Sequence, residues 1–370
     1  MAAVWTQDVD GEASGAYDYE AVPAVADSLV LAEFLVAAAS STLTLPLQQQ
    51  QQQHGCPLAA AAAKDESPME YFASTDSGSS GKSSPQGSPA KRKDGRMRMV
   101  AHRGSSHTAP ENTLASLNLA FRQGACGVEF DVQKSSDGEI FLLHDDTLRR
   151  TAAAERPATL ENHISHEEYC TMLDQDISTL SYWDFIQHID VGSWKGGEYH
   201  RERPCLMKDA METLPKGCFA LCEVKGGDKA TALAVTELAQ MHGWTSEQLT
   251  FIGFDLQVMT EIKEKLISMD LGDISVIYVQ DVATTEKALT VIKDAKLAGL
   301  DGVDFEADPD VVTNEVIQAA AEAGLQMGVW VWDKLPHSDT HPTASELNDR
   351  GIDFFTSDFP PMMCEWIAAC

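Results

Sequence analysis

The chain has 370 residues, of which 44% are hydrophobic, and a formal net charge of −30 at pH 7. This length and apolar share allow one large domain with a sizeable core, or two ordinary domains. Such a negative charge excludes a broad electrostatic attraction to nucleic acid or to an anionic membrane surface. A phosphate substrate would therefore need a local positive site inside a negative molecule.

Residues 1–95 are predicted to form a disordered, low-complexity tail. They contain a glutamine run over 48–53, an alanine run over 59–63 and a stretch rich in Ser, Gly, Pro and Lys over 74–96. Segments of this composition bury too little apolar surface to offset the entropy that is lost when they become ordered. The folded part is therefore expected to cover residues 96–370.

The sequence shows no targeting or membrane signal that we recognise. The most apolar stretch, over 28–47, is interrupted by Glu33 and is too weak for a transmembrane helix. Acidic residues within the first twenty positions argue against a transit peptide. The eight cysteines have no paired metal-type spacing, and we interpret them as reduced thiols. We therefore expect a cytoplasmic protein.

From Met97 onward, short apolar runs alternate with longer amphipathic ones. This alternation predicts crossover connections and a parallel sheet. About eight such units in the remaining chain favour an α/β fold of the TIM (β/α)8 barrel type over an open sheet. Strands are predicted over 99–102, 127–133, 140–144, 218–225, 249–254, 274–279, 302–305, 327–332 and 354–356. Helices are predicted over 113–123, 229–242, 257–268, 284–298 and 309–323.

The alternation stops between about residues 147 and 208. This stretch is long, polar and rich in aromatic residues, with no clear strand and helix rhythm. We interpret it as a small insertion after an early strand. Insertions at the ends of barrel strands build substrate caps, so this segment is a candidate cap.

Acidic residues of two predicted strands indicate a metal site. Side chains alternate along a strand, so Glu129 and Asp131 point to the same side, and Glu223 closes a later strand. Barrel active sites lie where the strands end, so the three carboxylates are expected to meet there. Oxygen ligands without a cysteine cluster suit a hard cation, Mg²⁺ or Ca²⁺.

Two histidines and two cations are predicted at the same mouth. His102 and Arg103 close the first strand, His144 closes a later one, and Lys225 follows Glu223 at the end of another. One histidine can remove a proton from an attacking oxygen while the other protonates a leaving oxygen. Arg103 and Lys225 can hold the nonbridging oxygens of a phosphodiester. The predicted chemistry is phosphodiester hydrolysis.

A resemblance to the glycerophosphodiester phosphodiesterase (GDPD) family runs through the stretch VAHRGSSHTAPENTLASLNLAFRQGACGVEFDVQKSSDGEIFLLHDDTLRRT. It continues in order through DVGSWKG, ALCEVK, VWVWDK and GIDFFTSDFP, over roughly residues 98–362. The resemblance implies a TIM barrel that cleaves a glycerophosphodiester to glycerol 3-phosphate and an alcohol. It implies acid/base histidines at His102 and His144, metal ligands at Glu129, Asp131 and Glu223, phosphate contacts at Arg103 and Lys225, and a cleft-lining aromatic at Trp330.

Three positions depart from the family pattern. Gly253 precedes Phe254 and Asp255 where the family usually has serine, and Asp333 replaces a usual asparagine. Ser357 precedes Asp358 where threonine is usual. None of these positions is an implied acid/base residue or metal ligand, so the departures bear on substrate preference.

Several residues also have structural interpretations. Glu111 and Asn112 are expected to act at the start of a helix, with a contact to the site as the alternative. Glu223 and Lys225 have the alternative of a structural ion pair. Trp330 either lines the cleft or fills the core.

Two rival functions remain beside glycerophosphodiester hydrolysis. A lysophospholipase D would use the same residues on a lysophospholipid and would need an apolar groove. The aromatics of the insertion supply that groove or form the insertion's own small core; they are Tyr169, Tyr182, Trp183, Phe185 and Trp194. The other rival is a catalytically inactive barrel that binds a phosphodiester. Loss of a histidine or an acid would favour it, and all of them are present.

Overall fold

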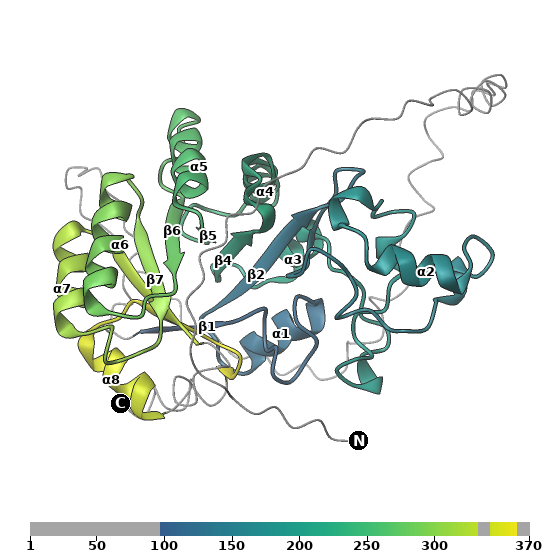
Figure 1. Cartoon of the computed structure of the whole chain (residues 1–370), viewed down its shortest axis with the longest axis horizontal. Coiled ribbons are helices and arrows are strands. Elements are labelled where there is room, and N and C mark those ends of the chain that lie inside the picture. The colour runs from purple at the N-terminus through teal and green to yellow at the C-terminus, as the bar shows by residue number, and fades with distance from the viewer. Residues whose placement is uncertain (1–96, 332–340, 361–370) are drawn as a thin grey trace, which may run out of the picture. The chain divides into compact units, whose positions relative to one another are not determined.

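A computed structural model describes residues 97–331 and 341–360. The predicted tail over 1–95 and the departure at Asp333 lie outside the described residues. Within them, eight parallel strands close into a barrel, because β1 pairs with both β2 and β9 (Figure 1). The predicted TIM barrel is confirmed. The barrel strands are β1 (Arg98–Ala101), β2 (Gly127–Lys134), β4 (Phe219–Val224), β5 (Leu249–Gly253), β6 (Ser275–Gln280), β7 (Gly302–Glu306), β8 (Gln326–Trp330) and β9 (Phe354–Ser357).

Helices cover the outside of the strands (Figure 1). Several begin at a Thr or Asp whose side chain accepts a backbone N–H of the first turn, as Thr113, Asp228 and Asp255 do. The helix predicted from residue 309 begins at Asn314, because Thr313 caps it. The helices are α1 (Leu114–Arg122), α2 (His166–Leu173), α3 (Met207–Thr213), α4 (Lys229–Met241), α5 (Leu256–Ser268), α6 (Thr285–Leu297), α7 (Asn314–Ala323) and α8 (His341–Arg350). None of the described helices is long and apolar enough to cross a membrane.

Strand β3 (Ile140–Leu142) differs from the parallel pattern. It pairs antiparallel with β2 and lies outside the closed barrel. Only residues 135–139 connect the two strands, and a parallel crossover needs a dozen or more residues. The hairpin returns the chain toward the middle of β2, where the Leu143 amide donates to the Asp131 carbonyl at 3.1 Å. The next residue is His144, so this hairpin brings the histidine back beside the acids.

The segment between β3 and α3 holds α2 and short 3-10 helices rather than strand and helix units. Figure 1 shows α2 to one side of the barrel strands. Tyr169, Tyr182 and Phe185 are buried in a hydrophobic cluster of this segment. Trp183 and Trp194 remain exposed. Three of the five aromatics therefore belong to the segment's own core.

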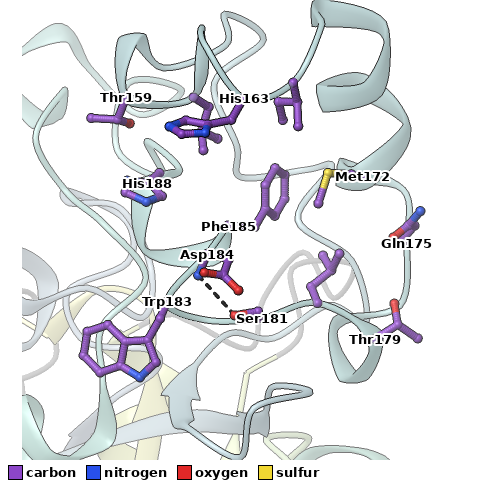
Figure 2. A pocket seen from close by; sticks show the side chains of 13 residues that line it. Thr159, His163, Met172, Gln175, Thr179, Ser181, Trp183, Asp184, Phe185 and His188 are labelled. Atoms are coloured by element: carbon purple, nitrogen blue, oxygen red, sulfur yellow. Dashed lines mark hydrogen bonds between the residues drawn. The ribbon is translucent and has the colours of Figure 1, made fainter. Parts of the chain in front are cut away.

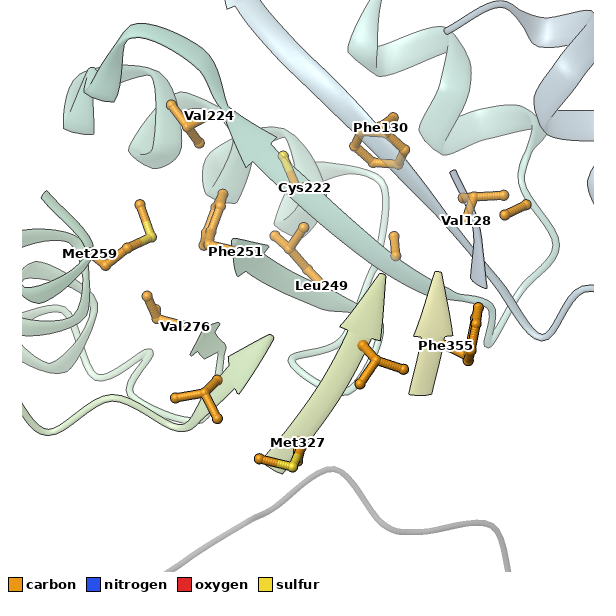
Figure 3. Close-up of a cluster of buried hydrophobic side chains, with 14 of the residues drawn as sticks. Val128, Phe130, Cys222, Val224, Leu249, Phe251, Met259, Val276, Met327 and Phe355 are labelled. Atoms are coloured by element: carbon orange, nitrogen blue, oxygen red, sulfur yellow. The ribbon is translucent and has the colours of Figure 1, made fainter. Parts of the chain in front are cut away.

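Two apolar layers hold the barrel. One lies between strands and helices, and Figure 3 shows part of it, including Val128 and Phe130 of β2. The other fills the barrel interior and includes Leu221 and Phe354. Gly328 leaves room for the Phe354 ring, since a Cβ there would lie 2.1 Å from ring atoms. Because Val128 and Phe130 point outward, Glu129 between them points inward.

Candidate active site

The three predicted metal ligands lie together inside the barrel. Asp131 of β2 is the register partner of Glu223 of β4, and Glu129 lies two residues earlier on the same face. Carboxylate oxygens of the three residues lie within 4.8 Å of one another. Glu129 and Asp131 are 3% and 1% exposed, so water screens their charges poorly.

The charge in this acidic cluster is only partly compensated. Burial and the charge of Asp131 raise the pKa of both Glu129 and Glu223. Burial opposes ionisation of Asp131 as well, but Arg103 and Lys225 hold its pKa below the ordinary value. Buried carboxylates that repel one another and offer several oxygen atoms fit a hard divalent cation.

The two predicted phosphate-binding cations border the acids. Arg103 Nε lies 3.4 Å from Asp131, and Lys225 Nζ lies 3.5 Å from it and 2.9 Å from Glu223. The Glu223 and Lys225 ion pair, expected as a structural alternative, is therefore formed at the acidic cluster itself. Arg103 has a φ of 53° and Gly104 a φ of 79°, so a left-handed turn carries the arginine back over the cluster.

His102 is held by a carboxylate that the sequence interpretation did not assign to the site. Its Nδ1 lies 2.7 Å from Asp358 Oδ1, and Ser106 Oγ donates to the same oxygen at 2.8 Å. Its Nε2 lies 3.9 Å from Glu129. Burial opposes the charged ring, yet Asp358 and Glu129 raise the pKa of His102. The signal in the sequence is Asp358 itself, which follows Ser357 in the stretch GIDFFTSDFP and agrees with the family pattern.

His144 has a similar partner. Its Nδ1 lies 2.7 Å from Asp145 Oδ1, and Arg150 binds that aspartate through contacts of 2.7 and 2.9 Å. Burial lowers the pKa of His144, although the charge of Asp131 opposes this change. With Nδ1 directed at a carboxylate, the Nε2 atom is the ring nitrogen available for proton transfer.

Glu111 and Asn112 contact the site rather than the helix start. Thr113 is the N-cap of α1. Buried Asn112 donates to Asp131 Oδ2 at 2.8 Å and accepts from the Asp131 amide at 3.2 Å. Glu111 accepts from Arg150 at 2.7 Å and from Arg103 at 2.9 Å. Both residues therefore fix groups around the acidic cluster.

Trp330 ends β8 and packs against the interior hydrophobic cluster. Its ring also meets that of Phe254 edge to face, with centroids 6.2 Å apart. Trp330, the predicted cleft aromatic, therefore lies at the barrel mouth, and part of its side chain packs against the core.

A separate cavity lies within the insertion (Figure 2). Its volume is about 550 Å³, and it shares no residue with the acidic cluster. Figure 2 shows His163, His188 and Phe185 among the residues that line it. We therefore do not assign this cavity to the candidate active site.

Residues 102–362 match the model of the Glycerophosphoryl diester phosphodiesterase family. The chain belongs to this family. One region of the chain matches Glycerophosphodiester phosphodiesterase 1 of Mus musculus with 54% identity. This region covers 31% of this chain and 42% of the mouse protein. The first curated relatives are thus matched over less than half of their own length.

Two solved structures resemble this GDPD-family barrel. One is an Oleispira antarctica phosphodiesterase in complex with the product sn-glycerol-3-phosphate, with a TM-score of 0.56 and 26% identity. The match covers 74% of this chain and 97% of that one. The other is a glycerophosphodiester phosphodiesterase from Agrobacterium tumefaciens, with a TM-score of 0.55, 20% identity, and coverage of 73% and 99%. At that identity the second likeness concerns the fold alone.

Proposed function

We propose that this protein hydrolyses glycerophosphodiesters to glycerol 3-phosphate and an alcohol. The observation that carries the proposal is one barrel mouth with three clustered carboxylates and two histidines, each bound to its own aspartate. The product bound to the Oleispira antarctica relative is the one expected here.

Glu129, Asp131 and Glu223 would hold Mg²⁺ or Ca²⁺, which when bound would neutralise the diester anion and make its phosphorus more electrophilic. Arg103 and Lys225 border the same acids and would contact the nonbridging phosphate oxygens. This arrangement supplies the local positive charge that a phosphate needs in a chain of net charge −30.

The histidines would move the protons. Because Asp358 and Asp145 hold the two Nδ1 atoms, each ring can use Nε2 toward the substrate. One ring would take the proton of the attacking oxygen, which belongs to water or to the glycerol 2-hydroxyl. Attack by the 2-hydroxyl would give a cyclic phosphate first, which water would then open to glycerol 3-phosphate. The other would protonate the oxygen of the departing alcohol, so that no unstable alkoxide leaves.

The test is release of glycerol 3-phosphate by the full chain from glycerophosphocholine, with Mg²⁺, Ca²⁺ and EDTA in parallel. We expect metal-dependent release that Glu129→Ala and His144→Ala abolish. Glu261→Gln, on the surface of α5, is the matched control and should retain activity. Release only from lysophosphatidylcholine would favour the lysophospholipase D alternative. Metal binding without turnover of either substrate would favour the inactive phosphodiester-binding barrel.

A further inference from the structure

Two aromatic rings meet across one side of the barrel mouth. Phe254 follows β5 and Trp330 ends β8, and β6 and β7 lie between these strands. Their ring centroids are nevertheless 6.2 Å apart, so the side chains reach over the ends of the intervening strands. Phe254 is 47% exposed, which is unusual for a phenylalanine and leaves an aromatic surface open at the mouth.

Acidic side chains lie beside this aromatic pair. Glu306 ends β7 and is the register partner of Trp330. Asp281, which follows β6, and Asp308 lie close enough for their negative charges to act on Glu306. Burial and Asp281 raise the pKa of Glu306 to about 7. The carboxyl groups therefore repel one another in a place where a cation would be attracted.

The loops that follow β5, β6 and β7 carry no lysine or arginine beside these acids, although the Arg350 guanidinium donates to the Pro309 and Val312 carbonyls of the last of these loops. The sequence contains neither lysine nor arginine over 253–256, 280–284 and 306–312. Between described residues, no ion pair involves Asp281 or Glu306.

A second carboxylate lies deeper on the same face of β7. Asp304 is 2% exposed, and its Oδ1 accepts no hydrogen bond from the described residues. That oxygen would lie 2.9 Å from a Cβ at Gly328, two residues before Trp330 on the same face of β8. Burial raises the pKa of Asp304 well above its ordinary value, so this carboxyl adds an unpartnered buried oxygen below the rim rather than a negative charge.

We propose that Phe254, Trp330, Asp281 and Glu306 form a subsite for the alkylammonium group of the departing alcohol. Aromatic faces attract weakly hydrated quaternary ammonium ions, and nearby carboxylates add Coulombic attraction. The inference rests on the proposed function, in which Arg103 and Lys225 hold the phosphate. These cations follow β1 and β4, the two neighbours of β2, and β7 lies four strands from β2 in either direction round the barrel. In a diester with a choline-type alcohol, the negative phosphate would lie toward Arg103 and Lys225, and the positive ammonium group would lie toward β7.

The first test compares kcat/KM of the full chain for glycerophosphocholine and for glycerophosphoinositol, whose alcohol is uncharged. We expect a preference for the choline diester of about tenfold. Phe254→Leu and Glu306→Gln should each lower kcat/KM more for the choline diester than for the inositol diester and so remove most of this preference. Trp183→Leu and Glu286→Gln, exposed and outside the subsite, are the matched controls. Equal kcat/KM values for the two diesters in the wild type would overturn the proposal.

The second test needs no turnover. Choline chloride is titrated into the full chain in EDTA, with tryptophan fluorescence as the readout and sodium chloride as the control for ionic strength. Saturable quenching that Phe254→Leu and Glu306→Gln both weaken supports the subsite, even if no diester is hydrolysed and the proposed function fails. Hydrolysis without choline preference, together with no choline binding, refutes the subsite and leaves the proposed function standing.

The ammonium group has two possible sources, a free glycerophosphodiester or a lysophospholipid. A parallel comparison of lysophosphatidylcholine with lysophosphatidylinositol separates them. A choline preference confined to the lysophospholipids would support the subsite with a lipid substrate. The same preference confined to the glycerophosphodiesters would support it with a free diester.

Discussion

Glu129→Gln should make the metal-free protein more stable, because Glu129 sits in a cluster of like charges. The carboxylate oxygens of Glu129, Asp131 and Glu223 lie within 4.8 Å of one another. Two unit charges at that separation repel by about 3.5 kcal/mol at an effective dielectric constant of about 20. Glutamine keeps an oxygen for the Arg103 amide, which donates to Glu129 at 2.9 Å, but loses the attraction to His102. We therefore expect a net gain of roughly 1–3 kcal/mol in the free energy of unfolding.

Thermal unfolding in EDTA, Mg²⁺ or Ca²⁺ at mildly alkaline pH measures this effect. The expected gain corresponds to a Tm increase of roughly 2–5 °C in EDTA for a domain of this size. Added metal should stabilise the wild type, because only the folded state assembles the three ligands, and should stabilise Glu129→Gln less. Glu261→Gln serves as the control and should behave as the wild type. A variant less stable than the wild type in EDTA, with an unchanged response to metal, would refute the reasoning.

Three further predictions follow from individual contacts. Asp358→Asn keeps a hydrogen-bond acceptor for His102 but removes the negative charge. The pKa of His102 should therefore fall in an NMR titration, and kcat/KM should drop about tenfold. An unchanged pKa of His102 would contradict this prediction. Although burial opposes ionisation, Arg150 and His144 lower the pKa of Asp145 to about 2. This folded-state pKa lies below the unfolded value of 3.8, so the ionised Asp145 stabilises the fold at pH values above 3.8. About 2 kcal/mol of the free energy of unfolding should therefore be lost as the pH falls from about 4 to 2. Denaturant titrations should show this loss, and Asp145→Asn should remove the pH dependence. Gly104→Ala should destabilise the fold by about 2–4 kcal/mol in urea, since its Cβ would lie 2.6 Å from the Ser116 backbone at a φ of 79°; a loss below about 1 kcal/mol would be inconsistent with that contact.

The sequence by itself determined the barrel and the acidic face. Strand and helix periods are local properties, so the alternation of apolar runs predicted the parallel strands and the helices between them. The two-residue period of β2 also predicted that Glu129 and Asp131 share a face opposite Val128 and Phe130. Because barrel sites gather at the strand ends, His102 and Glu223 could be assigned to the same mouth.

Only the tertiary structure decided which groups hold the histidines. His102 meets Asp358 across 256 positions of the chain, a contact that exists because β9 closes the barrel against β1. His144 returns to the acids through an antiparallel hairpin, although its strand had the same apolar pattern as a parallel one. Asn112 contacts Asp131 from the loop before α1, where local pattern indicated helix capping. Local periodicity constrains which way a side chain points along its own element, whereas its partner depends on closure, register and loop path, which no short window of sequence contains.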